Sequence, residues 1–189
     1  MSSAADGGEG PELRTERLLL RRWREEDRAP FAELNGDPLV MEHFPATLSR
    51  AESDELIERM ERSFREHGYG AWAVELPGSV ALAGFVGLWP QNSAELPFAP
   101  AIEIGWRLSR ECWGQGIATE AARAALAFGF GELGLEQIVA FTTVANDRSR
   151  AVMERLGMRR DPAEDFLHPA LAADDPLAPH VLYRIAGEG

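Results

Sequence analysis

The sequence predicts a mixed α/β fold, in which one central sheet of six to seven strands is flanked by about four helices in the order βααβββαβαβ. Three observations predict it. Apolar residues alternate with period two in 101–108, an apolar stripe of helical spacing follows Ser49, and a Gly-rich turn after Cys112 leads into an Ala-rich helix. We expect residues 1–12, which are small, polar and Gly-rich, to be a disordered leader, and residues 13–189 to form one domain.

The first half of the chain predicts one strand, two helices and two further strands. Strands are expected at 17–23, 70–76 and 82–89, with Pro77-Gly78 as the turn between the last two. A short helix is expected at 25–35. The second helix begins with Ser49 and Glu52 in a capping-box pattern and ends at Gly68.

The second half predicts a strand at 101–108, a helix at 118–133, a strand at 138–144, a helix from Asn146 or Asp147 to Leu156, and a last strand at 180–185. Gly157 is placed to close the last helix. In the strand 101–108, the alternation puts Glu103 on the face opposite four large apolar residues, which are Ile102, Ile104, Trp106 and Leu108.

Composition excludes several classes of function. A net charge of −12 argues against nucleic-acid binding and would suit a cationic acceptor such as an amine, although solubility alone explains most of it. No apolar run is long enough to cross a membrane, and the start of the chain lacks the basic and apolar regions of a signal peptide, so we expect a cytoplasmic protein. Cys112 is the single cysteine, and no His or Cys pair has metal-ligand spacing, so neither a disulfide nor a metal is expected.

The segment from Trp113 to Thr119 is the most informative for chemistry. It lies between a strand and a helix, so that its N–H groups would point out of a helix N-terminus and form an anion site. Gly114 and Gly116 would let a phosphate approach the backbone, and they could equally just make a tight turn. Neither a P-loop nor a Rossmann fingerprint fits, because Ile117 and Ala118 follow Gly116 and the third glycine is replaced by Thr119.

Three segments together resemble the GNAT superfamily of N-acetyltransferases, in its ribosomal-protein N-terminal acetyltransferase-like branch. Trp113–Ala121 is similar to the pyrophosphate motif of that branch, Glu103–Leu108 to the family's fourth strand, and Asn146–Met158 to its second coenzyme-contacting segment. The resemblance covers nearly the whole chain, from Arg17 to Ile185. It implies acetyl-CoA as co-substrate, direct transfer to an amine in a ternary complex, and a coenzyme site formed by Ile104, Trp106, Leu108, Trp113, Gly114, Gln115, Gly116, Ile117, Ala118, Thr119, Asn146 and Ser149.

Two residues are candidates for catalysis. Glu103 is the candidate general base, acting through a water; the alternative is an ordinary surface carboxylate. Ser149 is the candidate proton donor to the departing thiolate, because it matches a position where the resembled branch often has serine; the alternative is an ordinary residue in the first turn of a helix. A tyrosine that has this role elsewhere in the superfamily is replaced here by Met153. Cys112 invites an acetylated-thiol mechanism, but no His lies near it in the sequence, and a packed, inert thiol is the preferred interpretation.

The resemblance implies a primary amine as the acceptor, either a protein or peptide N-terminus or a small molecule. Trp89 and His168 are the candidate acceptor contacts, with core packing and an ordinary surface histidine as the alternatives. The end of the last strand could pair two protomers into a homodimer. A non-catalytic acyl-CoA-binding sensory module is the competing function, and a structural interaction domain ranks after it.

Overall fold

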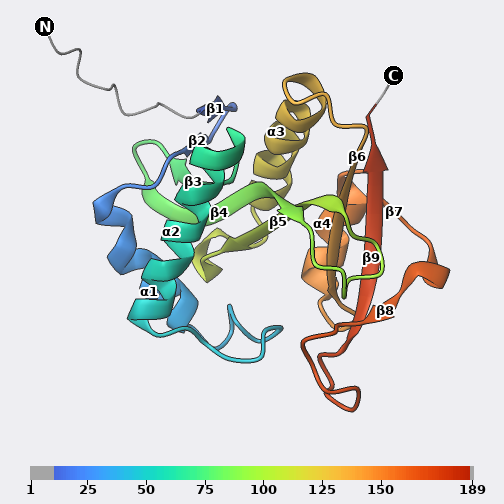
Figure 1. Ribbon diagram of the computed structural model, residues 1–189. Helices are drawn as coiled ribbons and strands as arrows, with labels where there is room; N and C mark the ends of the chain where they lie inside the picture. Colours follow the sequence, from blue (N-terminus) through green and yellow to red (C-terminus); the bar gives the residue numbers. More distant parts are fainter. Residues whose placement is uncertain (1–10, 188–189) are drawn as a thin grey trace, which may run out of the picture.

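The computed structural model describes residues 11–187 and confirms the mixed α/β fold. Its elements are β1 (Leu13–Arg14), β2 (Leu19–Arg21), η1 (Glu25–Asp27), α1 (Arg28–Gly36), α2 (Arg50–His67), β3 (Ala71–Leu76), β4 (Val80–Gln91), β5 (Ala101–Leu108), η2 (Arg110–Cys112), α3 (Ile117–Gly131), β6 (Gln137–Thr143), α4 (Asp147–Arg155), β7 (Arg159–Arg160), η3 (Pro162–Glu164), β8 (Phe166–Leu167) and β9 (Pro179–Ala186). Figure 1 shows their arrangement.

The nine strands form one mixed sheet in the order β1-β2-β3-β4-β5-β6-β9-β7, with β8 paired to β9. The sheet exceeds the expected six to seven strands because β1, β7 and β8 are two-residue strands, too short to leave a periodic pattern in the sequence. All neighbours pair antiparallel except β5 and β6, which run parallel. Most of the expected leader lies outside the described residues. Its Pro11 is described, and the carbonyl of Pro11 accepts a hydrogen bond from the indole of Trp72 (2.6 Å).

Helix boundaries follow the sequence signals. Ser49 caps α2 in a reciprocal capping box with Glu52, and Gly68 ends it with a φ of 78°. Asn146 caps α4, since its side-chain oxygen accepts a hydrogen bond from the N–H of Ser149 (3.1 Å). The first expected helix instead begins as the 3₁₀ turn η1 and continues as α1.

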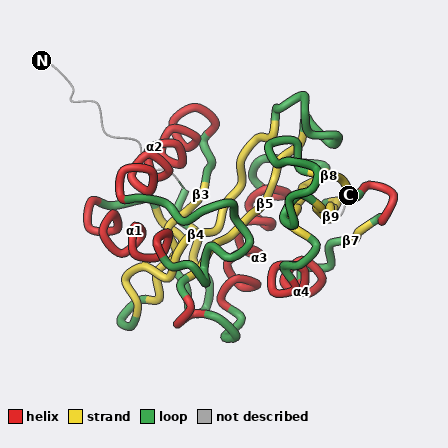
Figure 2. The backbone as a smooth tube through the Cα atoms, turned by 90° about the horizontal axis from the view of Figure 1, so that it is seen from below, coloured by secondary structure: helices red, strands yellow, loops and turns green. Residues whose placement is uncertain are grey.

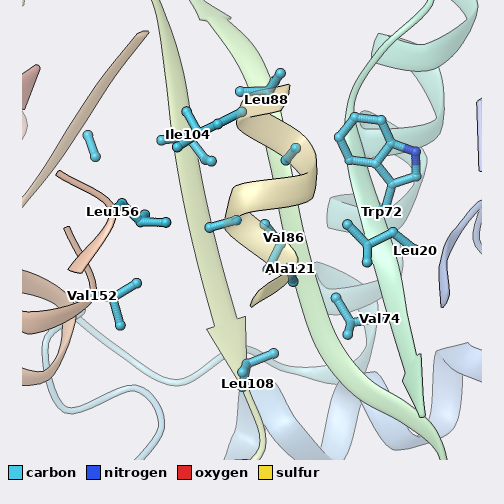
Figure 3. Close-up of a cluster of buried hydrophobic side chains, with 14 of the residues drawn as sticks. Leu20, Trp72, Val74, Val86, Leu88, Ile104, Leu108, Ala121, Val152 and Leu156 are labelled. Carbon is cyan, nitrogen blue, oxygen red and sulfur yellow. The ribbon is translucent and has the colours of Figure 1, made fainter. Parts of the chain in front are cut away.

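The helices cover the two faces of the sheet separately (Figure 2). On one face, α3 and α4 pack on the strands through the largest apolar cluster, to which Ile104 and Leu108 contribute from β5. Figure 3 shows these two side chains on the same side of the sheet as Ala121 of α3. On the other face, Phe31 of α1 and Ile57 of α2 pack against the opposite side chains of β3 and β4. The alternation of β5 therefore leaves Glu103 on the α1–α2 side, as predicted.

A buried ion pair joins the first strand to the start of α1. Arg21 and Asp27 are each 2% exposed and form a bidentate pair, with nitrogen–oxygen distances of 2.7 and 2.9 Å. Arg21 also donates to Glu75 (2.6 Å) and to the carbonyl of Ala81 (3.1 Å). The pair thus ties β2 and β3 to the turn from which α1 begins.

We predict that Asp27→Asn lowers the free energy of unfolding by about 3–5 kcal/mol, because it leaves a buried guanidinium without its main counter-charge. Urea denaturation measures this change. Glu12→Gln is the matched control: it removes an exposed pair with Arg14 and should cost less than about 1 kcal/mol. Equal costs for the two variants would contradict the assignment of Arg21 and Asp27 as a structural pair.

Candidate functional site

The sheet opens between β5 and β6. The two parallel strands share one pairing, Glu103 with Val139, near the start of each strand. The N–H of Ser109 donates to the carbonyl of Ala83 on the β4 side (2.8 Å), so by the alternation of an antiparallel ladder the peptide groups of Ile104, Trp106 and Leu108 point away from β4. The N–H of Ile104 takes part in the Glu103–Val139 pairing, whereas the peptide groups of Trp106 and Leu108 point into the gap that β6 leaves.

A cavity of about 1170 Å³ lies at this opening. It brings together every predicted site residue except Gln115, drawing them from four elements and the loops between them. These residues are Trp89, Glu103, Ile104, Trp106, Leu108, Trp113, Gly114, Gly116, Ile117, Ala118, Thr119, Asn146, Ser149 and His168. Gln115 does not line the cavity: its side chain donates to the carbonyl of Glu111, and its own carbonyl accepts from Arg17.

The N-terminus of α3 faces the cavity through glycine. Gly116 is the N-cap, with a φ of 77°, and no side chain caps the helix there. The N–H groups of the first turn are therefore free for an anion. A Cβ on Gly114, whose φ is 71°, would meet nothing within 4 Å, so the loop is open on that side. Trp113 holds the turn against β5, because its indole N–H donates to the carbonyl of Leu108 (2.9 Å).

Glu103 is a buried carboxyl group, 8% exposed, rather than a surface carboxylate. The indole of Trp89 donates to its Oε2 (2.9 Å), and so does the side-chain amide of Gln91. Burial raises the pKa of Glu103 to about 7, and the two hydrogen bonds oppose that rise only in part. A carboxyl group with this pKa can take up and release a proton near neutral pH.

On the other side of the cavity, α4 presents Ser149 and Met153. Met153 is 2% exposed and belongs to the apolar core, although it also lines the cavity. Asn146 uses its side chain as the helix cap, and its amide group donates to Thr142 (3.0 Å). The sequence left two roles open to Asn146, a contact to the arm of the coenzyme and the cap of the last helix, and the structure shows the cap.

Two histidines, His168 and His180, lie in contact in the cavity wall, with their ring planes tilted by 44°. The rings of His168 and His180 are 4.9 Å apart and pack against Phe141 and Phe166. Burial lowers the pKa of both histidines, so they are neutral at neutral pH. The predicted contact His168 thus belongs to an aromatic wall that also includes His180, which the sequence analysis took only as the start of a strand.

The sequence analysis did not single out Arg107 and Phe44. Arg107 lies two residues beyond Gly105 on the Glu103 face of β5, so the same period of two could have found it. Phe44 comes from the irregular segment between α1 and α2, where no periodic pattern exists, and it lies under the guanidinium of Arg107 at 4.2 Å. Both residues line the cavity.

Cys112 also lines the cavity but is packed as expected for an inert thiol. It is 3% exposed, and the hydroxyl of Ser109 lies 3.3 Å from its sulfur. Among residues 11–187, no group of three or more His, Cys, Asp and Glu side chains could hold a metal ion. In the same range, no helix is both long and apolar enough to cross a membrane.

Comparisons with known proteins agree with this arrangement. The model of the acetyltransferase (GNAT) domain matches residues 17–159. The chain is 34% identical over 158 residues to FsC-acetyl coenzyme A-N(2)-transacetylase of Aspergillus fumigatus, covering 78% of this chain and 65% of that protein. It is 39% identical over 67 residues to the putative ribosomal N-acetyltransferase YdaF of Bacillus subtilis, covering 35% and 37% of the two chains. An acetyltransferase structure from Agrobacterium tumefaciens superposes with a TM-score of 0.75 at 26% identity, covering 94% and 95%.

We predict that Glu103→Gln raises the free energy of unfolding above that of the parent protein, and that this gain is larger at pH 8 than at pH 5. The folded-state pKa of about 7 lies above the ordinary 4.5, so the contribution of Glu103 to stability is complete below about pH 4.5 and is lost as the pH rises through 7. Glutamine still has an oxygen that accepts the hydrogen bond from Trp89, but it does not ionise. The variant therefore avoids the decrease in the free energy of unfolding, which is on the order of 3 kcal/mol at about 1.4 kcal/mol per pKa unit. Urea unfolding of both proteins across this range measures it. A difference between them that is independent of pH would show that Glu103 titrates normally.

Proposed function

The chain belongs to the GNAT acetyltransferase family and is an acyltransferase, and from this premise we propose that it transfers the acetyl group of acetyl-CoA directly to a primary amine in a ternary complex. One observation carries the proposal. A single cavity holds the open peptide groups of β5, the uncapped N-terminus of α3 and the buried Glu103. These supply, in one place, an anchor for the arm of the coenzyme, an anchor for its diphosphate, and a base.

The glycine turn fits a diphosphate. The N–H groups of Ile117, Ala118 and Thr119 lack a side-chain cap, and their helix adds the positive end of its dipole. A neighbouring cavity of about 760 Å³ shares Gly116, Thr119 and Arg155 with the main one. Its wall also includes Arg17 and Arg123, whose guanidinium groups suit the phosphorylated nucleotide end of coenzyme A.

The open strand fits the pantetheine arm. The arm contains amide groups, and the free N–H and C=O of Trp106 can pair with them as a neighbouring strand would. A thioester laid along this edge has its carbonyl beside a backbone donor, which stabilises the negative charge that develops on the oxygen during attack. Leu108 contributes only its N–H, because its carbonyl already accepts from Trp113.

Glu103 acts as the general base. An ammonium has no lone pair, so the acceptor must lose a proton before it attacks the carbonyl carbon of the thioester. Glu103 accepts this proton through a water, because it points to the α1–α2 face of β5 while the thioester lies along the β6 edge. As the tetrahedral intermediate collapses, the C–S bond breaks and Ser149, which lines the same cavity, passes its hydroxyl proton to the departing thiolate. The proton that the acceptor nitrogen loses as it becomes the amide nitrogen then restores the hydroxyl of Ser149. Cys112 is buried and its sulfur accepts a hydrogen bond from the hydroxyl of Ser109, and neither feature activates the thiol for an acetylated intermediate.

The names of relatives support two acceptor types. One relative is named as a transacetylase of an N(2) position of FsC and another as a putative ribosomal N-acetyltransferase. Trp89, beside the base, and the aromatic wall of His168 and His180 line the cavity and would contact either acceptor. The cytoplasmic location and the homodimer stay predictions.

We predict that Gly116→Ala weakens acetyl-CoA binding at least about tenfold, because a side chain and a shifted loop at the helix N-cap disturb the N–H groups that face the diphosphate. Isothermal titration calorimetry with acetyl-CoA measures the affinity. Gly134→Ala is the control, since Gly134 also has a positive φ (62°) and open space around its Cβ position but lies outside both cavities. If both variants bound acetyl-CoA like the parent protein, the diphosphate would lie elsewhere.

We predict that Glu103→Gln lowers kcat/KM for acetyl transfer by about a hundredfold while acetyl-CoA affinity holds. In the parent protein, kcat/KM rises as the pH passes about 7, because the carboxyl group of Glu103 loses its proton. At higher pH, kcat/KM rises further only because the amine itself loses its proton. The variant should keep only the second dependence. Thiol release from pH 5.5 to 9 measures both profiles, and a variant that retains the step near pH 7 would remove Glu103 from the role of base.

A further inference from the structure

Arg107 lies on the same face of β5 as Glu103, with only Gly105 between them. On the neighbouring strand β4, Arg107 pairs with Phe85, Gly105 with Gly87, and Glu103 with Trp89. Both glycines lack side chains, so the surface between the carboxyl group and the guanidinium is formed by the two backbones and the ring of Trp89, which lies over Gly105. Residues four apart on a strand have Cα atoms about 13 Å apart. The cavity thus has an acid at one end of this surface and a cation at the other.

The guanidinium of Arg107 lacks a counter-charge within residues 11–187. Its Nη1 donates to the neutral side-chain oxygen of Asn35 (2.6 Å), and its plane lies over the rings of Phe44 (4.2 Å) and Phe85 (5.5 Å). Its Nε is buried without an acceptor. Burial lowers the pKa of Arg107 to about 10, which leaves the group charged at neutral pH.

The protein holds this charge in place with neutral groups. Asn35 and Ser53 are fully buried, and the amide of Asn35 donates to the hydroxyl of Ser53 (2.8 Å), which turns its oxygen toward Arg107. The buried Arg21, by contrast, has two carboxylates. The other arginines of the cavity are differently placed: Arg148 pairs with Glu42, and Arg155 lies at the end shared with the second cavity.

We propose that Arg107 binds a carboxylate of the acceptor, so that the substrate class is an amine that also carries a carboxylate several bonds away; this inference rests on the acetyl transfer proposed above. With Nη1 bound to Asn35, the Nε and Nη2 edge remains, and this edge donates two parallel hydrogen bonds to a carboxylate. The carboxylate would satisfy the buried Nε and supply the missing counter-charge. Such an acceptor is zwitterionic, so its ammonium still suits a protein of net charge −12.

The test compares matched acceptors that differ in the carboxylate alone. Thiol release is measured with 6-aminohexanoate against hexylamine, and with 4-(aminomethyl)benzoate against 4-methylbenzylamine. We expect the acid of each pair to have a kcat/KM at least about tenfold higher, mostly through KM, because the charged hydrogen bonds from Arg107 would hold the carboxylate. In Arg107→Met this ratio falls to about one. Asn35→Asp, which supplies an internal carboxylate, lowers it in the same way, whereas Arg59→Met on the exposed face of α2 keeps it.

The outcomes separate the two proposals. Turnover without preference for the acid, or a preference that survives in Arg107→Met, overturns the role of Arg107 and leaves acetyl transfer standing. If no amine is acetylated, thermal unfolding with saturating coenzyme A still tests Arg107: millimolar 4-methylbenzoate should raise Tm and 4-methylbenzyl alcohol should not. Loss of that shift in Arg107→Met supports the carboxylate site, and an equal shift in the variant overturns it.

Discussion

The single pairing between Glu103 and Val139 is the constraint on which the rest of the site depends. Because buried backbone groups must be paired, a sheet that continued past this point would consume the peptide groups of β5. The strands part instead, and Trp106 keeps a free donor and acceptor at the mouth of the cavity. The same opening places the N-terminus of α3 beside the strand, held there by the hydrogen bond from Trp113 to Leu108. The uncapped N-terminus of α3 and the open edge of β5 thus meet at one break in the sheet.

The alternation of β5 divides packing from chemistry. Ile104 and Leu108 face α3 and α4 and belong to the main apolar cluster, whereas Glu103 and Arg107 face the α1–α2 side. Burying an ionisable carboxyl group and an unpaired guanidinium costs free energy. The main apolar cluster offsets that cost, because it fixes β5 through the face that packs against α3 and α4. The arrangement fits the view that functional residues are where a protein departs from optimal stability.

Much of this could be predicted from the sequence, because the responsible signals are local. Period two placed Glu103 opposite the core, the capping box of Ser49 and Glu52 located α2, and paired glycines before an Ala-rich run located the uncapped N-terminus of α3. The acceptor end could not be predicted in the same way. Arg107 and Asn35 are 72 residues apart, and their contact depends on how α1 packs against the sheet. Phe44 lies in an irregular segment, and the contact of His168 with His180 requires the β8–β9 pairing, in which β8 has only two residues and leaves no pattern.

The most direct test of this account is hydrogen exchange of the Trp106 backbone amide by NMR, with and without saturating acetyl-CoA. The account holds that this N–H is unpaired in the free protein and pairs with the pantetheine arm when the coenzyme binds. It predicts fast exchange in the free protein and strong protection in the complex, while the amide of Ser109, already bound to Ala83, changes little. Trp106 exchange that is unchanged in a complex known to have formed would contradict the claim that the open edge of β5 binds the coenzyme.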